Sequence, residues 1–368
     1  MTYTVAIIGT GAEPENPSRD GYAMAYHHAA GYEKLNDCTL VGCADIVRKN
    51  AEAFADEFGL DDDAVFEKHD ALLEALEPDI VSICVPPAVH TEIAVDCIHS
   101  GVVKAIHCEK PMADTYGGAK LMTQEANRHG VQLTFNHQRR FSDAVRTAKE
   151  LLDAGEIGDL QRIEFSSPVG LFDYGSHSFD LCNYFNDETP GKWVLGQIDY
   201  TEENVVFGSH NENQAIVHWE YTNGVHGIAA SDSTGTGGPV SAFHSHNRLI
   251  GTDGVIVVGP ESEDEEKEPP ALRIRRDGKG WEAVNTEDGL HGWEFIDRAI
   301  ADNVRCLREN EPPELRAENA LNATELIFAT WESSRRHGRV DLPLTIEDNP
   351  LQSMLNSGDL TPAPVGEN

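Results

Sequence analysis

Three side chains that can move a proton lie in two short segments of the sequence. Lys110 follows the β-branched stretch Val102–Ile106 and precedes Pro111, so it lies where an expected strand ends in a turn. Asp173 and His177 are four residues apart, which places them on one face if a helix begins there. A lysine, a carboxylate and an imidazole can together take a proton from an alcohol while a hydride leaves the same carbon. This chemistry requires a hydride acceptor.

The N-terminal segment predicts a dinucleotide site. Tyr3–Ile8 is an apolar run suited to a buried parallel strand, and Gly9-Thr10-Gly11 follows at once. Backbone N–H groups at the start of the next helix can receive a pyrophosphate, and glycine lets the backbone approach it. In the dinucleotide-binding fingerprint a third small residue follows three positions after the second glycine. Here polar and proline residues stand at that place, so the third small residue is either Ala25 or Gly21, further along the chain.

Asp45 is the expected ribose-binding acid. It follows the strand Thr39–Ala44 and lies twenty residues after Ala25, the spacing typical of that role. Its carboxylate would accept hydrogen bonds from both adenosine ribose hydroxyls and repel a 2′-phosphate. Because Ile46 adds no positive charge, we expect NAD rather than NADP, although Arg48 is a nearby base. The expected cofactor contacts are Gly9, Thr10, Gly11, Ala25, Asp45, Ile46, Val85, Pro86, His90, Glu109 and Lys110.

The alternation of elements predicts an α/β fold with two domains. Residues 1–136 alternate strands with the helices Arg48–Phe58, Asp70–Leu76, Ala88–Ser100 and Tyr116–His129, a pattern typical of a doubly wound Rossmann domain. Residues 137–348 are richer in short strands, which predicts a C-terminal α/β domain with a large, mostly antiparallel, open-faced sheet. The helices Trp293–Arg308 and Leu315–Arg336 close it, and 349–368 reads as a polar tail. A free sheet face favours a homodimer or homotetramer.

Composition limits the partners and the compartment. The formal charge of −35 argues against nucleic acids and anionic membranes. Repulsion among so many negative charges is tolerable in concentrated salt, where the Debye screening length is about 3 Å at 1 M. We therefore expect the protein to work in the cytoplasm of a halophile. Seven cysteines without a CxxC spacing favour a reducing cytosol, and neither an 18-residue apolar run nor a basic signal start is present. His244 and His246 lack a third ligand, so no metal is expected.

The ordered motifs resemble the Gfo/Idh/MocA oxidoreductases, the glucose–fructose oxidoreductase and inositol dehydrogenase family. They are Gly9-Thr10-Gly11, Asp45, Cys84-Val85-Pro86-Pro87 with His90, Glu109-Lys110-Pro111, 136–141, 173–180 and 333–344.

The resemblance implies a Rossmann domain, an open-sheet C-terminal domain and NAD(P)-linked oxidation or reduction of a sugar or cyclitol. Lys110 matches the family's active-site lysine, and Asp173 with His177 its acid–imidazole pair. It also implies that His177 takes the hydroxyl proton and that the Lys110–Pro111 bond is cis. Alternatives are an NAD-dependent glycosidase acting by transient oxidation, and a non-catalytic nucleotide-sensing regulator.

Two further expectations concern charged residues near the second segment. Arg139 and Arg140 are expected to form salt links between the domains, with a substrate or phosphate oxygen as the alternative partner. Asp180, three residues past His177, is expected to be a helix-facing residue without a role in the site, with a supporting role behind the catalytic residues as the alternative.

Overall fold

The computed structural model describes residues 2–12, 23–167, 169–232, 245–260, 270–290 and 292–364. Gly21, most of the loop after Gly11, His244 with the side chain of His246, and most of the acidic run 260–270 lie outside the described residues. The chain forms two compact units, Met1–Gln138 with Trp293–Leu321, and Arg139–Gly292 with Asn322–Asn368. In the described residues no helix is both long and apolar enough to cross a membrane.

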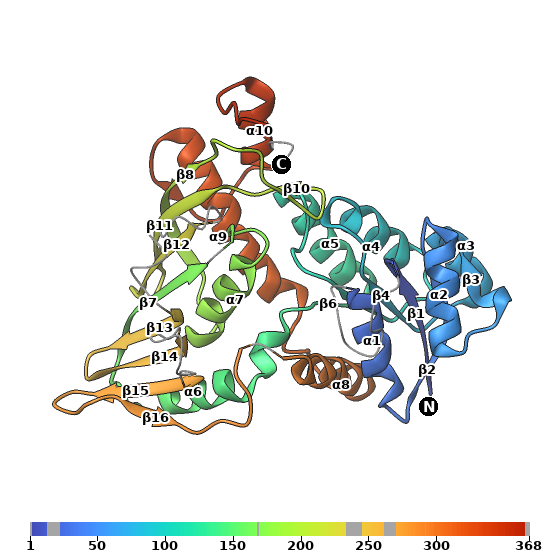
Figure 1. The fold of residues 1–368 in the computed structure, drawn as a ribbon, viewed down its shortest axis with the longest axis horizontal. Coiled ribbons are helices and arrows are strands. Elements are labelled where there is room, and N and C mark those ends of the chain that lie inside the picture. Colours follow the sequence, from blue (N-terminus) through green and yellow to red (C-terminus); the bar gives the residue numbers. More distant parts are fainter. Residues whose placement is uncertain are drawn as a thin grey trace. The chain divides into compact units, whose positions relative to one another are not determined.

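The first unit is built on a six-stranded parallel sheet (Figure 1), with strand order β3-β2-β1-β4-β5-β6. Its strands are β1 Tyr3–Ile8, β2 Cys38–Ala44, β3 Val65–Phe66, β4 Ile80–Ile83, β5 Ala105–Cys108 and β6 Gln132–Phe135. Its helices are α1 Met24–Glu33, α2 Arg48–Phe58, α3 His69–Leu76, α4 His90–His99, α5 Tyr116–His129 and α8 Glu294–Glu309. Short 3₁₀ turns cover Asp62–Ala64, Pro87–Val89 and Gln138–Phe141.

Both faces of this parallel sheet are buried, as its apolar strands predict. In β4, Ile80 packs in one apolar layer and Val81 in the other, because successive side chains point to opposite faces. The layer that holds Ile80 also contains Ile300 of α8, which packs against α1. A Cβ built on Gly31 of α1 would lie 2.7 Å from Cδ1 of Ile300, so the two helices pack closely there.

The second unit contains a nine-stranded mixed sheet, ordered β16-β15-β14-β13-β7-β12-β11-β8-β17. Its strands are β7 Leu160–Ser167, β8 Gly191–Asp199, β11 Gln214–Tyr221, β12 His226–Asp232, β13 Ser245–Gly251, β14 Gly254–Pro260, β15 Leu272–Arg276, β16 Glu282–Val284 and β17 Val340–Asp341; β9 Val205–Val206 and β10 Ser209–His210 form a separate pair. Among the described strands of this sheet, β7 and β12 are the one pair that runs in parallel. Its helices are α6 Asp143–Asp153, α7 Gly175–Phe185, α9 Ala317–Arg336, whose first turn belongs to the first unit, and α10 Pro350–Ser357.

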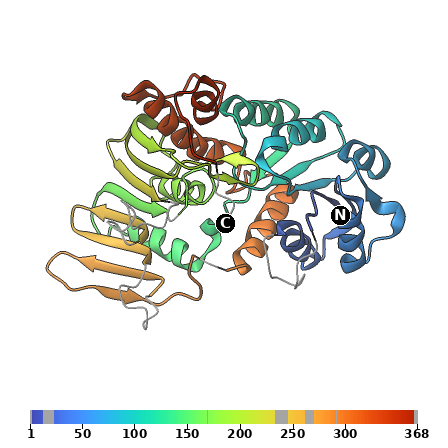
Figure 2. The same ribbon diagram turned by 45° about the horizontal axis from the view of Figure 1, so that its top comes forward.

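Helices cover one face of the nine-stranded sheet. In Figures 1 and 2, α7 and α9 lie on the same side of it, and α7 contacts β7 and β13. On the other face Leu195 of β8 and Ile216 of β11 are about half exposed, at 48% and 55%. The expected α/β class, with a Rossmann unit and a mostly antiparallel open-faced sheet, is confirmed.

The structure differs from the expected elements at three places. The strand before Lys110 was expected at Val102–Ile106, but β5 begins at Ala105 and ends at Cys108. The strand therefore ends two residues before Lys110. Residues 293–321 pack with the first unit, although the helix Trp293–Arg308 was expected to close the second. An amphipathic pattern shows that a helix has a buried face, but it does not show which element covers that face. Part of the expected polar tail forms α10, where Asn349 caps the helix and Leu351 is buried. The limits at 136 and 348 stay a prediction.

Candidate functional site

The carboxyl ends of four adjacent parallel strands carry most of the predicted cofactor contacts. Gly9 follows β1, Asp45 follows β2, Val85 follows β4 and Glu109 follows β5. The strand order reverses between β1 and β4, which is the position where open α/β sheets bind their ligands. Backbone hydrogen bonds keep these ends together: the N–H of Gly9 donates to the carbonyl of Ala44 at 2.8 Å.

The glycine loop after β1 has the shape that a dinucleotide requires. Gly9 has φ +85°, and a Cβ there would lie 2.4 Å from Cγ1 of Val85, so only glycine permits this approach. Gly11 has φ +69°, and no described atom would lie within 4 Å of a Cβ built on it. The positive φ angles of Gly9 and Gly11 let the loop backbone turn closely past a bound dinucleotide, and the residues present fit NAD.

The Asp45 carboxylate lies directly against this loop. Its Oδ2 accepts hydrogen bonds from the Gly11 N–H at 2.9 Å and from Thr10 Oγ1 at 3.2 Å. Its Oδ1 accepts from the N–H of Val47 at 2.8 Å, which orients the side chain. Arg48, the base that could favour NADP, pairs with Glu52 at 2.8 Å. Ile46 is 90% exposed, and Ala25 is buried in the first turn of α1.

Glu109, next to Lys110 in the sequence, lies in a buried polar cluster. Its Oε1 accepts from His28 Nε2 at 3.0 Å and from Asn136 Nδ2 at 2.7 Å, and its Oε2 accepts from the Lys110 N–H at 3.2 Å. Nδ1 of His28 lies 2.6 Å from Ser82 Oγ. Burial alone would raise the pKa of Glu109, but His28 and Asn136 outweigh it and hold the pKa at about 2.

The expected contact of Glu109 with the cofactor stays a prediction. Both carboxylate oxygens bond to donors of the chain itself, and the residue is only 7% exposed. Its role is to hold the backbone from which the Lys110 side chain extends. The Lys110–Pro111 peptide bond is cis, as the resemblance implied.

His90 supports the same turn from the other side. Its Nε2 lies 2.7 Å from the carbonyl oxygen of Val85, and its Nδ1 lies 3.0 Å from that of Pro111. The side chain is fully buried, and burial is the main reason that its pKa is lowered. Both ring nitrogens face backbone carbonyls, which places His90 between the turn after β4 and the turn after β5. That His90 borders the nicotinamide stays a prediction.

The second unit holds the acid–imidazole pair at the start of α7. The helix begins at Gly175, so Asp173 lies in the preceding turn and His177 in the first helical turn. The Asp173 N–H donates to Asn211 Oδ1 at 3.1 Å, and the Asp173 carbonyl accepts from Ser176 Oγ at 2.7 Å. His177 is 5% exposed.

Glu212, next to Asn211, anchors this turn. It is fully buried and accepts hydrogen bonds from the Leu171 N–H at 2.6 Å, Ser231 Oγ at 2.9 Å and Trp331 Nε1 at 2.9 Å. Three donors satisfy the carboxylate, as a buried acid requires. The turn that carries Asp173 is thus held by groups outside the motif, which sequence reasoning missed.

Arg140 and Asp180 form a buried ion pair inside the second unit. Nε and Nη2 of Arg140 each donate to Asp180 at 2.7 Å, and Nη1 lies 2.7 Å from Glu188. The expectation of a salt link between domains is therefore wrong for Arg140, and whether Asp180 has a role in the site stays a prediction. Arg139 lies over the Tyr174 ring at 4.4 Å, beside Asp173. Both arginines position the segment around α7.

The three predicted catalytic residues are divided between the two units. Lys110 belongs to the first unit, whereas Asp173 and His177 belong to the second. Their convergence stays a prediction.

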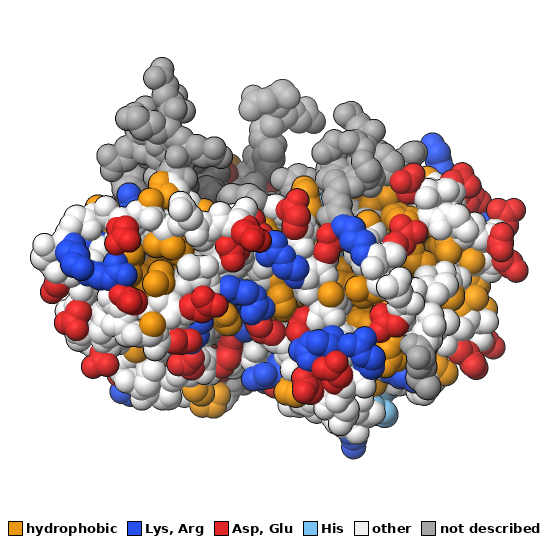
Figure 3. All heavy atoms as spheres, turned by 90° about the horizontal axis from the view of Figure 1, so that it is seen from below, with side chains coloured by type: hydrophobic (Ala, Val, Ile, Leu, Met, Phe, Trp, Pro, Cys, Tyr) orange, Lys and Arg blue, Asp and Glu red, His pale blue; other side chains and the backbone are white. Residues whose placement is uncertain are grey.

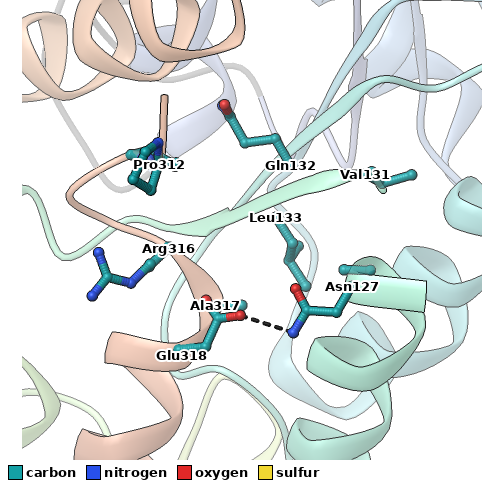
Figure 4. A pocket seen from close by; sticks show the side chains of 10 residues that line it. Asn127, Val131, Gln132, Leu133, Pro312, Arg316, Ala317 and Glu318 are labelled. Atoms are coloured by element: carbon teal, nitrogen blue, oxygen red, sulfur yellow. Dashed lines mark hydrogen bonds between the residues drawn. The ribbon is translucent and has the colours of Figure 1, made fainter. Parts of the chain in front are cut away.

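A separate pocket of about 280 Å³ lies at the amino end of β6 (Figure 4). It is lined by residues of α5, β6 and α9, among them Gln132 and Arg316, and a hydrogen bond of 2.8 Å joins Asn127 to Glu318 on its wall. None of the predicted cofactor or catalytic residues lines it. It lies at the opposite end of the sheet from the dinucleotide loop.

The fold and the glycine loop define an NAD-binding oxidoreductase. Residues 3–137 match the family model described as "Oxidoreductase family, NAD-binding Rossmann fold", and residues 161–342 match its C-terminal alpha/beta domain. These matches cover most of the chain, which belongs to the Gfo/Idh/MocA oxidoreductase family.

Individual relatives match over shorter stretches. The D-glucoside 3-dehydrogenase of Escherichia coli is 30% identical over 156 residues, 42% of this chain and 40% of the relative. An inositol 2-dehydrogenase of Serratia proteamaculans is 25% identical over 236 residues, 61% of this chain and 65% of the relative. The chain thus spans less than two thirds of the length of these relatives. A solved aldose-aldose oxidoreductase of Caulobacter crescentus shares the fold, with a TM-score of 0.74 and 16% identity over 93% of this chain and all of that one.

Proposed function

We propose that this protein is an NAD-dependent dehydrogenase that oxidises a hydroxyl-bearing carbon of a sugar, polyol or cyclitol. The observation that carries the proposal is the Asp45 carboxylate, which lies 2.9 Å from the Gly11 N–H at the end of a sheet that also presents Lys110. The named activities of the glucoside and inositol dehydrogenases support the substrate class.

The chain's own residues supply binding and proton transfer. NAD, when bound, supplies the hydride acceptor. Gly9, Thr10 and Gly11 would hold its pyrophosphate, and Asp45 its adenosine ribose. His177 takes the proton from the substrate hydroxyl, Asp173 orients and polarises the imidazole, and Lys110 donates a hydrogen bond to the reacting oxygen.

The electrostatic reason for Lys110 is the developing negative charge on that oxygen. A fixed cation beside an alkoxide lowers the barrier to proton loss more than it stabilises the neutral alcohol. The inward-facing Glu109 and His90 hold the turn on which Lys110 lies. The lysine is thereby presented by a rigid element, which catalysis requires.

The proposal is tested by screening inositols, aldoses and alkyl glucosides for accumulation of NADH in about 2 M KCl. Accumulating NADH with the ketone product supports a dehydrogenase. Glycoside cleavage with no net NADH would instead identify a glycosidase that oxidises its substrate transiently. If no substrate reacts although NAD binds, the catalytic proposal fails.

We further propose a homo-oligomer that assembles through the open face of the nine-stranded sheet. Leu195 and Ile216 expose apolar surface there, which pairing would cover. Size-exclusion chromatography with light scattering, comparing the wild type with Ile216→Lys, tests this: a dimer or tetramer that dissociates in the variant supports it.

The halophilic cytoplasm remains part of the proposal. The chain carries a formal charge of −35, and Figure 3 shows acidic groups interleaved with Lys and Arg on the face in view. All seven cysteines are free thiols, which suits a reducing compartment.

A further inference from the structure

Two histidines and a glutamate meet at the C-terminal ends of α4 and α5. His99 is the last residue of α4, and His129 is the last residue of α5, four residues after Glu125. His99 Nε2 lies 2.7 Å from Oε2 of Glu125, and His129 Nε2 lies 3.5 Å from the same oxygen. One atom from each residue lies within 4.8 Å of the other two.

The fold fixes this meeting point. α4 connects the parallel neighbours β4 and β5, and α5 connects the parallel neighbours β5 and β6. Both helices therefore run in the same direction, and both end where the next strand begins (Figure 1). α4 packs against α5. Near their beginnings, a Cβ on Gly118 would lie 2.5 Å from Thr91 Oγ1, so the two helices are close along their length.

The donor set suits a transition metal ion. Two imidazoles and one carboxylate are the ligand types that Zn²⁺ and Ni²⁺ take, whereas Mg²⁺ and Ca²⁺ prefer oxygen ligands only. With metal–ligand bonds of about 2.0–2.1 Å, ligand atoms of a tetrahedral site lie about 3.3 Å apart. The separations of 2.7 and 3.5 Å bracket that value. The histidines are 48% and 41% exposed, which leaves the fourth position open to water.

The charged groups around His99, Glu125 and His129 are compatible with binding of a metal cation. Oε2 of Glu125 lies next to both histidines, at 2.7 Å from His99 Nε2 and 3.5 Å from His129 Nε2. Arg128 lies 3.4 Å from the other oxygen, Oε1, and its side chain is 75% exposed, so it can turn into solvent. The charge of −35 favours binding of a cation over the surface as a whole.

We propose that His99, Glu125 and His129 bind a divalent transition metal ion such as Zn²⁺, which links α4 to α5. The link is structural. α4 rises about 1.5 Å per residue, so His99 lies roughly 14 Å along the helix from His90, the residue that supports the Lys110 turn. The metal stabilises the first unit and takes no part in proton transfer.

Titration of the metal-free full-length protein with ZnCl₂, followed by calorimetry without NAD or substrate, tests this proposal. His99→Ala and His129→Ala should each lose one equivalent of bound Zn²⁺ or bind it at least 10-fold more weakly, and Zn²⁺ should raise the melting temperature of the wild type more than that of either variant. The matched control is His69→Ala. His69 also pairs with a carboxylate, Asp96 at 2.9 Å, but belongs to no three-ligand cluster among the described residues, so its variant should bind Zn²⁺ as the wild type does.

Two outcomes would overturn the proposal. One is wild-type binding no tighter than about 1 mM, and the other is binding that neither histidine substitution changes, which would assign the Zn²⁺ to cysteines or other side chains. The cluster would then be an ion pair only. Glu125→Gln serves as a further variant if circular dichroism shows that an alanine variant is misfolded. Because no cofactor or substrate is present, the result is independent of the dehydrogenase proposal.

Discussion

Replacing Glu109 by glutamine removes a buried charge while keeping the shape of the side chain. The fall of the Glu109 pKa from its ordinary 4.5 to about 2 corresponds to about 3 kcal/mol of stability at pH 7. The introduced glutamine could still accept hydrogen bonds from His28 and Asn136 through its remaining oxygen, but its NH₂ group would face the Lys110 N–H. We therefore expect Glu109→Gln to lose about 3 kcal/mol in the free energy of unfolding at pH 7.

The stability that Glu109 contributes should decrease as the pH falls. A carboxylate with a depressed pKa stabilises the fold fully above its unfolded value of about 4.5, and this stability is lost as the pH falls toward about 2. The difference between the wild type and Glu109→Gln should therefore shrink to about 2 kcal/mol at pH 3.5.

Urea unfolding at pH 7 and pH 3.5 measures the difference, and hydrogen exchange of peptides from β4 to β6 assigns it to the first unit. Asp96→Asn is the matched control. Asp96 also pairs with a histidine but its side chain is 51% exposed, so its loss should cost less than about 1 kcal/mol. A Glu109→Gln effect below about 1 kcal/mol at pH 7, or one that does not shrink at pH 3.5, would refute the reasoning.

Three further predictions concern catalysis, the cofactor and salt. Lys110→Ala should lower kcat by roughly 10²-fold or more, while the Kd for NAD measured by fluorescence titration changes little; near-normal turnover would remove Lys110 from the active site. Asp45→Asn should raise the KM for NAD about 10-fold and reduce the preference for NAD over NADP in steady-state kinetics; equal use of both cofactors by the wild type would contradict the assignment of Asp45. Activity and melting temperature should rise between about 0.05 M and 2 M KCl, and equal values would show that the charge of −35 has another cause.

Elements with strong periodicity could be predicted from the sequence, several to the residue. β1 Tyr3–Ile8, α2 Arg48–Phe58 and α5 Tyr116–His129 have the expected bounds. Asp45 and Lys110 could also be placed, because a residue that follows a parallel strand must lie at the carboxyl edge of the sheet. These inferences depend only on local patterns and on the order of elements.

Contacts between residues distant in sequence could not be predicted. Glu109 and His28 are 81 residues apart, and no pattern in either segment shows that the carboxylate turns inward. Asn211 and Glu212 lie in a polar stretch between expected strands, which is typical of an exposed loop, although Glu212 is fully buried. Burial of polar groups depends on the partners that tertiary packing brings, and only the structure shows those partners.

The central claim is direct hydride transfer from a carbohydrate carbon to NAD with His177 as the base. The measurement that tests it most directly follows deuterium from the oxidised carbon of a C-deuterated inositol or glucoside, whichever the substrate screen selects. Mass spectrometry and NMR of the recovered cofactor should show deuterium at C4 of the nicotinamide, with transfer at least about 10²-fold slower in His177→Ala. Deuterium that appears in water instead, or transfer at the wild-type rate in His177→Ala, would contradict the account.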